Sequence, residues 1–125
     1  MYRMLLSINP EFVNEIFSGR KRYEFRKAKC KEDVQMMLIY ETSPIMQVVG
    51  QARIEDVIIG HPKEVWKKTS SHAGISKHFF DLYFQGRKKA VAYKLADVQK
   101  FDRPLPLSHF GIDHAPQSFQ YVAES

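Results

Sequence analysis

The sequence predicts an α+β fold, mainly β, in which about five to seven strands form a closed or nearly closed mixed β-barrel with two or three short helices. Strand-like alternation of apolar and polar residues dominates the chain, and the helical inserts are too few for a doubly wound sheet. The run from Val34 to Tyr40 is apolar on both faces, which is typical of a strand buried on both sides. The next long strand, Met46 to Ile59, contains Gly50, which indicates a bulge where the sheet curls.

The first predicted elements are a strand over Met4 to Ile8 and a helix over Pro10 to Ser18. Apolar residues recur at helical spacing in the second segment: Phe12, Val13, Ile16 and Phe17. Gly19 is the predicted C-cap, because glycine tolerates the left-handed conformation that turns a helix into a strand. Asn9 is predicted to cap the start of the helix, although Ser7 and Asn9 also suit the lining of a cleft.

The later part of the chain supplies two further helical segments and two further strands. One helix begins at His61, and the other runs from Ser76, its predicted N-cap, to Phe84. The aromatic residues of the second helix are predicted to fill one mouth of the barrel; in the alternative, the ring at position 83 or 84 faces the cleft. Strands follow at Lys88 to Val98 and at Phe119 to Val122, and the last is expected to close the barrel.

Composition predicts one domain, residues 1–125, because this length with 44% hydrophobic residues supplies one core and not two. The formal net charge of +5 and the 13% aromatic content favour a polyanionic partner such as nucleic acid. Cys30 is the only cysteine, which excludes an intramolecular disulfide and fits a reducing cytoplasm. No run approaches the roughly 20 apolar residues of a membrane-spanning helix, and the N-terminus lacks a signal-peptide core, so no membrane partner is predicted.

The sequence predicts neither a metal site nor a cofactor. The five histidines, at positions 61, 72, 78, 109 and 114, show no helical i,i+4 pair and no acidic partner at ligand spacing. The sequence also lacks the glycine-rich loops that hold nucleotide phosphates and the nucleophile elbow of hydrolases. Chemistry that depends on those motifs is therefore not expected.

The most distinctive chemistry lies in the stretch from Gly19 to Lys27, where one carboxylate stands among several cations. Strand alternation turns the two aromatic residues of this stretch toward the core and places Glu24 on the opposite face, between Arg22 and Arg26. One interpretation is a ladder of exposed ion pairs on a basic edge, worth about 0–1 kcal/mol. The other is a functional site at the corner between the helix and the strand.

This corner resembles a family signature, because Gly19, Lys21, Glu24 and Arg26 match the Gly-x-Lys-x-x-Glu-x-Arg pattern of ASCH domains, a branch of the PUA-like superfamily of small β-barrels. Four other segments are similar to parts of these domains: Ser7 to Pro10, Tyr40 to Pro44, Val48 to Gly50, and Pro116 to Phe119. The resemblance implies a PUA-like mixed β-barrel, in which the signature strand, the first helix and the turn after the central strand border one cleft. It nominates the following site residues: Lys21, Glu24, Arg26, Tyr40, Ser43 and Gln117.

The first function that the resemblance implies is a module that binds RNA or a nucleotide. Lys21 and Arg26 would hold phosphate. Glu24 would accept a hydrogen bond from a base or a ribose hydroxyl, and Tyr40 would offer a ring for stacking. Single-stranded or looped RNA is the favoured ligand by analogy with PUA-like domains, and nothing in this function requires turnover.

The alternative is a small hydrolase, because some ASCH proteins are similar small enzymes that deacetylate N4-acetylcytidine with the signature lysine, a threonine and a glutamate, and others are described as ribonucleases. In that case Lys21 and Glu24 would be catalytic. The sequence departs from the deacetylase pattern, since Glu24 occupies the threonine position and Ala73 falls where the glutamate is expected. A lysine paired with a carboxylate is expected to stay protonated, which suits phosphate binding better than attack on an amide, so binding is favoured over catalysis.

Overall fold

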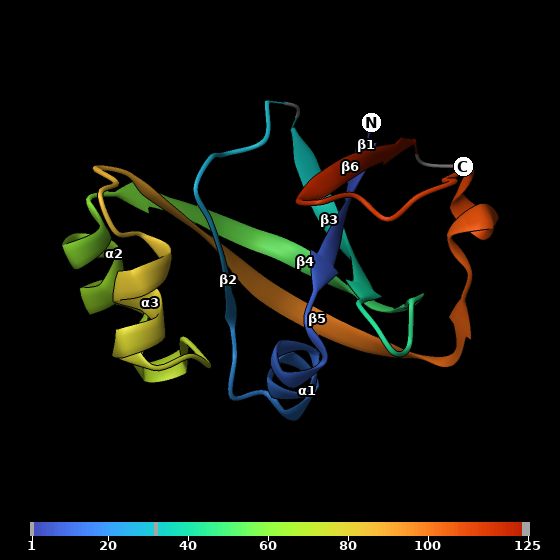
Figure 1. The fold of residues 1–125 in the computed structure, drawn as a ribbon, viewed down its shortest axis with the longest axis horizontal. Helices are drawn as coiled ribbons and strands as arrows, with labels where there is room; N and C mark the ends of the chain where they lie inside the picture. The colour runs from blue at the N-terminus through green and yellow to red at the C-terminus, as the bar shows by residue number, and fades with distance from the viewer. Residues whose placement is uncertain (1, 32, 124–125) are drawn as a thin grey trace.

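The computed structural model describes residues 2–31 and 33–123, and this part of the chain forms one mixed six-stranded sheet with three α-helices (Figure 1). The strands are β1 (Tyr2–Ile8), β2 (Tyr23–Arg26), β3 (Val34–Glu41), β4 (Gln47–Gly60), β5 (Ala90–Leu105) and β6 (Phe119–Ala123). The α-helices are α1 (Pro10–Ser18), α2 (Pro62–Thr69) and α3 (Lys77–Tyr83). The predicted fold class, α+β and mainly β, is confirmed.

The sheet has the order β2-β5-β4-β3-β1-β6, and β1 runs parallel to β3 while the other pairs are antiparallel. The expected closure of the barrel is wrong, because β2 and β6 are edges of the described sheet and β6 pairs with β1 alone. The edge strand β2 does approach the end of β1, where Arg26 Nη2 donates to the Ser7 carbonyl oxygen at 3.1 Å. A side chain therefore spans the gap in which a closed barrel would have a backbone ladder.

Helix α1 has the predicted bounds and delivers the chain into β2. Gly19 adopts φ 85°, and its backbone N–H donates to the Ile16 carbonyl oxygen at 3.1 Å. Val13 and Ile16 are buried in the main core cluster, which anchors the helix on the sheet. Just beyond the cap, the backbone N–H of Lys21 donates to the Glu15 carbonyl oxygen at 3.0 Å. The helix and its cap therefore fix the position of the Lys21 backbone.

The bulge predicted at Gly50 is present in β4. The pairing of β4 shifts register in this region against both β3 and β5. A Cβ atom at Gly50 would collide with the Gln99 carbonyl oxygen and with the ring of Phe17. The absence of a side chain thus lets α1 lie close to the bent strand.

The helices α2 and α3 lie together at one end of the sheet, on the left of Figure 1. Helix α3 begins after Ser76, whose Oγ accepts a hydrogen bond from Phe79 N at 3.0 Å, so the capping prediction is confirmed. The expectation that all the aromatic residues of this helix fill one barrel mouth is wrong. Phe80 and Phe84 are buried in a second core cluster, whereas Phe79 is 43% exposed. The helix therefore divides its rings between the core and a surface cavity.

Candidate functional site

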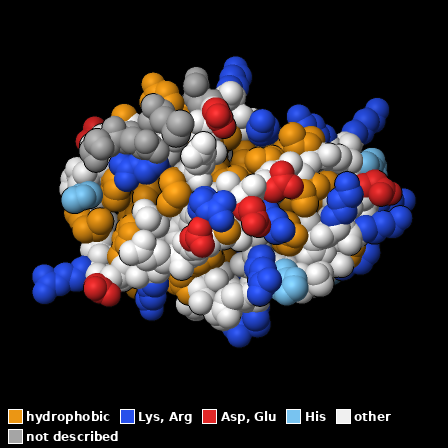
Figure 2. Space-filling model, turned by 180° about the vertical axis from the view of Figure 1, so that it is seen from behind, with side chains coloured by type: hydrophobic (Ala, Val, Ile, Leu, Met, Phe, Trp, Pro, Cys, Tyr) orange, Lys and Arg blue, Asp and Glu red, His pale blue; other side chains and the backbone are white. Residues whose placement is uncertain are grey.

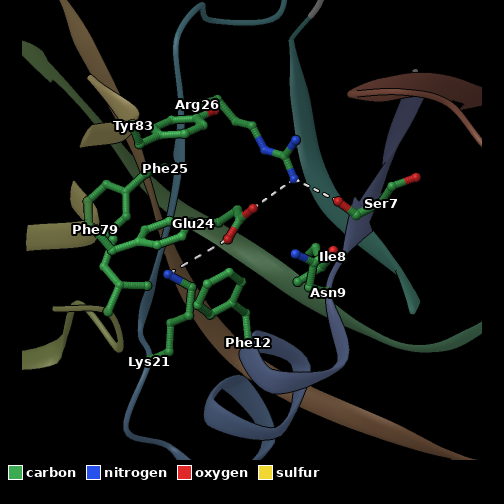
Figure 3. A pocket seen from close by; sticks show the side chains of 11 residues that line it. Ser7, Ile8, Asn9, Phe12, Lys21, Glu24, Phe25, Arg26, Phe79 and Tyr83 are labelled. Carbon is green, nitrogen blue, oxygen red and sulfur yellow. Dashed lines mark hydrogen bonds and ion pairs between the residues drawn. The ribbon is translucent and has the colours of Figure 1, made fainter. Parts of the chain in front are cut away.

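The predicted corner forms a buried triad of charged side chains, Lys21, Glu24 and Arg26, drawn in Figure 3. Arg26 Nη2 lies 2.7 Å from Glu24 Oε2, and Lys21 Nζ lies 3.8 Å from Glu24 Oε1. Each cation has a second acceptor on the backbone, because Lys21 Nζ donates to the Ala73 carbonyl oxygen at 2.9 Å and Arg26 Nη2 donates to that of Ser7. The single carboxylate is thus shared between two cations, and each cation also donates to the backbone of a different segment of the chain.

The interpretation of this stretch as an exposed ladder of ion pairs is wrong. Lys21 is only 2% exposed and Glu24 only 7%, and Lys21 replaces Arg22 as the second partner of the carboxylate. Arg22 is exposed instead. Charges buried to this extent are expensive unless they are paired and hydrogen-bonded, as these are. The triad therefore has a structural role, because each member keeps the others from being buried without a partner.

Burial lowers the pKa of Lys21 below its ordinary value, and the neighbouring Glu24 carboxylate offsets only part of this effect. Arg26 adds to the lowering by repulsion. Desolvation thus outweighs the stabilisation that the carboxylate gives to the protonated amine. An amine of this kind exchanges its proton nearer to neutral pH than a surface lysine does.

A cavity of about 170 Å³ opens beside the triad. Its lining combines the three charged residues with aromatic and small polar side chains: Ser7, Ile8, Asn9, Phe12, Lys21, Glu24, Phe25, Arg26, Ile75, Phe79 and Tyr83. Lys21 Nζ lies 4.8 Å from the ring centre of Phe25 and 5.7 Å from that of Phe12, so the amine is enclosed by rings. Pockets for drug-sized ligands typically measure roughly 300–1,000 Å³. This cavity is smaller, and its size suits one ring or one sugar unit.

The structure brings together Lys21, Glu24 and Arg26 but leaves the other three nominated residues outside the cavity lining. Tyr40 is only 2% exposed and packs in a separate core cluster, so no ring face is free for stacking. Ser43 lies exposed in the turn after β3, and Gln117 lies exposed ahead of β6. Their roles in binding receive no support from this placement.

The sequence analysis missed the aromatic wall that Phe12 and Phe79 form, with their ring centres 5.3 Å apart. Tyr83 also lines the cavity, as one alternative had predicted. Ser7 and Asn9 line it as well; Asn9 also occupies the predicted N-cap position of α1, although its side chain makes no cap hydrogen bond. Polar residues at the end of β1 were the one signal for this part of the lining.

Gly74 is packed against Lys21, and Gly74→Ala is expected to disturb the triad. Gly74 has φ +68°, and a Cβ atom there would overlap the Lys21 side chain. Gly111 has φ +73° with no atom within 4 Å of its Cβ position, so Gly111→Ala measures the left-handed backbone cost alone, about 1–2 kcal/mol. We expect Gly74→Ala to lower the free energy of unfolding by about 1–3 kcal/mol more, measured by urea denaturation. Equal losses in the two variants would contradict the contact.

Residues 2–31 and 33–123 contain neither a cluster of potential metal ligands nor a helix suited to span a membrane. No group of three or more His, Cys, Asp or Glu residues in this part is arranged to hold a metal ion. None of its helices combines the length and the apolar character needed to cross a membrane.

Comparison with known proteins places this geometry in a family. The sequence model of the ASCH domain matches residues 6–104. The chain belongs to the ASCH domain family. The crystal structure of ASCH from Zymomonas mobilis superposes on this ASCH chain with a TM-score of 0.88 and 30% identity, covering 98% of this chain and 88% of the other. The fold and the family are therefore both shown.

Two curated relatives of this ASCH chain carry more specific names. The ASCH domain-containing ribonuclease of Zymomonas mobilis is 34% identical over 104 residues, which are 82% of this chain and 70% of that protein. The large ribosomal subunit protein uL22 of Ureaplasma parvum serovar 3 is 32% identical over 120 residues, which are 95% of this chain. This chain spans only 39% of the length of that uL22 protein.

Proposed function

We propose that this ASCH protein binds single-stranded RNA and holds one nucleotide unit in the cavity beside Lys21. The observation that carries the proposal is a buried triad with two cations and one carboxylate, set among aromatic rings in a cavity of about 170 Å³. The family and the ribonuclease-named relative support an RNA-related function in general. The specific cleft and the bound unit are our inference from the geometry.

Each part of the cavity offers a contact that a nucleotide can use. The Nε atom of Arg26 is buried and has no hydrogen-bond partner among the described residues, so an anionic oxygen would satisfy a donor that is otherwise costly. Glu24 can accept from an amino group or a ribose hydroxyl. Phe12, Phe79 and Tyr83 replace Tyr40 as the rings available for stacking.

Lys21→Met tests the proposal, since it removes one cation and leaves the Arg26–Glu24 pair in place. We expect binding of single-stranded RNA to weaken at least about tenfold at low salt, with the log–log salt slope reduced by about 0.7 for the lost phosphate contact. Lys77→Met is the matched control, because Lys77 is 65% exposed and pairs with Asp81 on α3. No binding by the wild type, or equal losses in the two variants, would refute the site.

RNA cleavage is the second candidate, and the lowered pKa of Lys21 is the observation that favours it. An amine that exchanges protons nearer to neutral pH, beside a carboxylate, is a pair suited to general acid and base roles. The name of the Zymomonas mobilis relative agrees with this activity. Deacetylation has less support, because the resemblance expects a glutamate at the position of Ala73. There Lys21 Nζ donates to a backbone carbonyl oxygen, and no side-chain carboxylate is present at that position.

A further inference from the structure

Four cations lie beside the cavity with no carboxylate partner. Lys27 follows β2 directly, and Arg87, Lys88 and Lys89 fill the turn between α3 and β5; we call these four residues the basic strip. All four are exposed, and none lies within ion-pair distance of a carboxylate in the described residues. Arg20 and Lys77, by contrast, pair with Glu15 and Asp81. The strip is thus a group of exposed positive charges without ion-pair partners among the described residues.

The fold brings the two halves of the strip together at one rim of the cavity. Strand β2 pairs antiparallel with β5 and sets Arg26 opposite Val91, so the residues that follow β2 run alongside those that precede β5. Tyr83 links the strip to the cavity, because it lines the cavity and Lys27 Nζ lies 4.8 Å from its ring centre. The strip thus begins where the lining of the cavity ends.

The opposite rim has the other sign. Glu11 and Glu15 of α1 line a neighbouring hollow that shares Phe12 and Phe79 with the cavity. Arg20 neutralises Glu15 at 2.6 Å, but Glu11 has no cationic partner in the described residues. A polyanion is therefore repelled along α1 and attracted over Tyr83. Figure 2, which shows the molecule from the other side, has Lys and Arg side chains interspersed with Asp and Glu side chains across the middle of that face and further Lys and Arg side chains toward one edge.

Resting on the proposed RNA binding, we infer that the RNA strand leaves the cavity over Tyr83 and that its flanking phosphates lie on the basic strip. The ligand is then an oligonucleotide and not a free nucleotide, because a single nucleotide occupies the cavity and reaches little of the strip. The strip supplies affinity that grows with RNA length and falls with salt, while the cavity supplies the contacts to one unit.

The test compares two fourfold variants of equal charge. The strip variant replaces all four residues of the basic strip by alanine. The control variant replaces four other exposed lysines by alanine: Lys63, Lys67, Lys68 and Lys100. Each is titrated with an eight-nucleotide and a two-nucleotide single-stranded RNA at several salt concentrations. For the longer RNA we expect the strip variant to bind at least about tenfold more weakly than the control, with a salt slope lower by roughly 1–2. For the dinucleotide we expect the two variants to differ by less than about threefold.

The outcomes separate this inference from the proposed function. If the wild type binds the longer RNA and Lys21→Met weakens that binding, but the strip variant matches the control variant, the path of the strand is wrong and the cavity stands. If the strip variant loses the dinucleotide and the longer RNA equally, the strip belongs to the binding of one unit, which also overturns the inference. If the wild type binds neither RNA, both proposals fail.

Discussion

Glu24→Ala is expected to lower the free energy of unfolding by about 3–5 kcal/mol, because it leaves two buried cations without their shared counter-charge. Lys21 is 2% exposed and the Arg26 side chain 13%, so both cations lie largely out of bulk water. The backbone acceptors of Ala73 and Ser7 remain, but they carry no net charge. Urea denaturation with the midpoint and the slope both fitted measures the loss.

Glu15→Ala is the matched control for this effect. Glu15 pairs with Arg20 at 2.6 Å, shorter than either pair of Glu24, but the Arg20 side chain is 67% exposed. Its removal should cost about 0–1 kcal/mol. Adding Lys21→Met to Glu24→Ala should recover part of the loss, since one of the two stranded cations is then gone. Similar losses for Glu24→Ala and Glu15→Ala would contradict a buried, interdependent triad.

Local signals were enough to predict the helix and the corner that position the triad. The spacing of apolar residues gave α1, and the left-handed Gly19 ended it where expected. The bulge at Gly50 was equally local, because it needs only a glycine within a long strand. The family resemblance, and not strand alternation, singled out Lys21 together with Glu24. Features decided within a few residues of sequence were therefore predictable.

Features decided by distant segments were not predictable. Alternation placed Glu24 on a solvated face, but in the folded chain Glu24 is only 7% exposed and its partner Lys21 donates to the carbonyl oxygen of the distant Ala73. Closure of the sheet depends on how its edge strands meet. The edge strand β2 contacts β1 through the Arg26 side chain and not through a backbone ladder. The family resemblance assigned Tyr40 to the cleft, whereas its side chain packs in a separate core cluster. Burial and direction of side chains follow from tertiary packing that periodicity does not encode.

Glu24→Gln separates RNA cleavage from binding alone, since the carboxylate has opposite roles in the two. In cleavage, Glu24 would accept the proton of a ribose 2′-hydroxyl while its oxygen attacks the adjacent phosphorus; Lys21 would donate a proton to the departing 5′-oxygen as the P–O5′ bond breaks. The products would be a 2′,3′-cyclic phosphate and a 5′-hydroxyl. We expect Glu24→Gln to lower the cleavage rate by roughly two to four orders of magnitude with RNA binding retained.

If the protein only binds RNA, neither the wild type nor Glu24→Gln cleaves it, and the variant holds or raises affinity because repulsion of phosphate is relieved. Glu15→Gln serves as the control for loss of a carboxylate outside the triad, and circular dichroism establishes that each variant is folded at the assay temperature. An RNA with one 2′-deoxy sugar sharpens the test, since it should bind normally but resist cleavage at that sugar. If Glu24→Gln cleaves RNA as fast as the wild type, and the wild type still cleaves at the 2′-deoxy sugar, Glu24 is excluded as the base and the reaction at this site must be a different one.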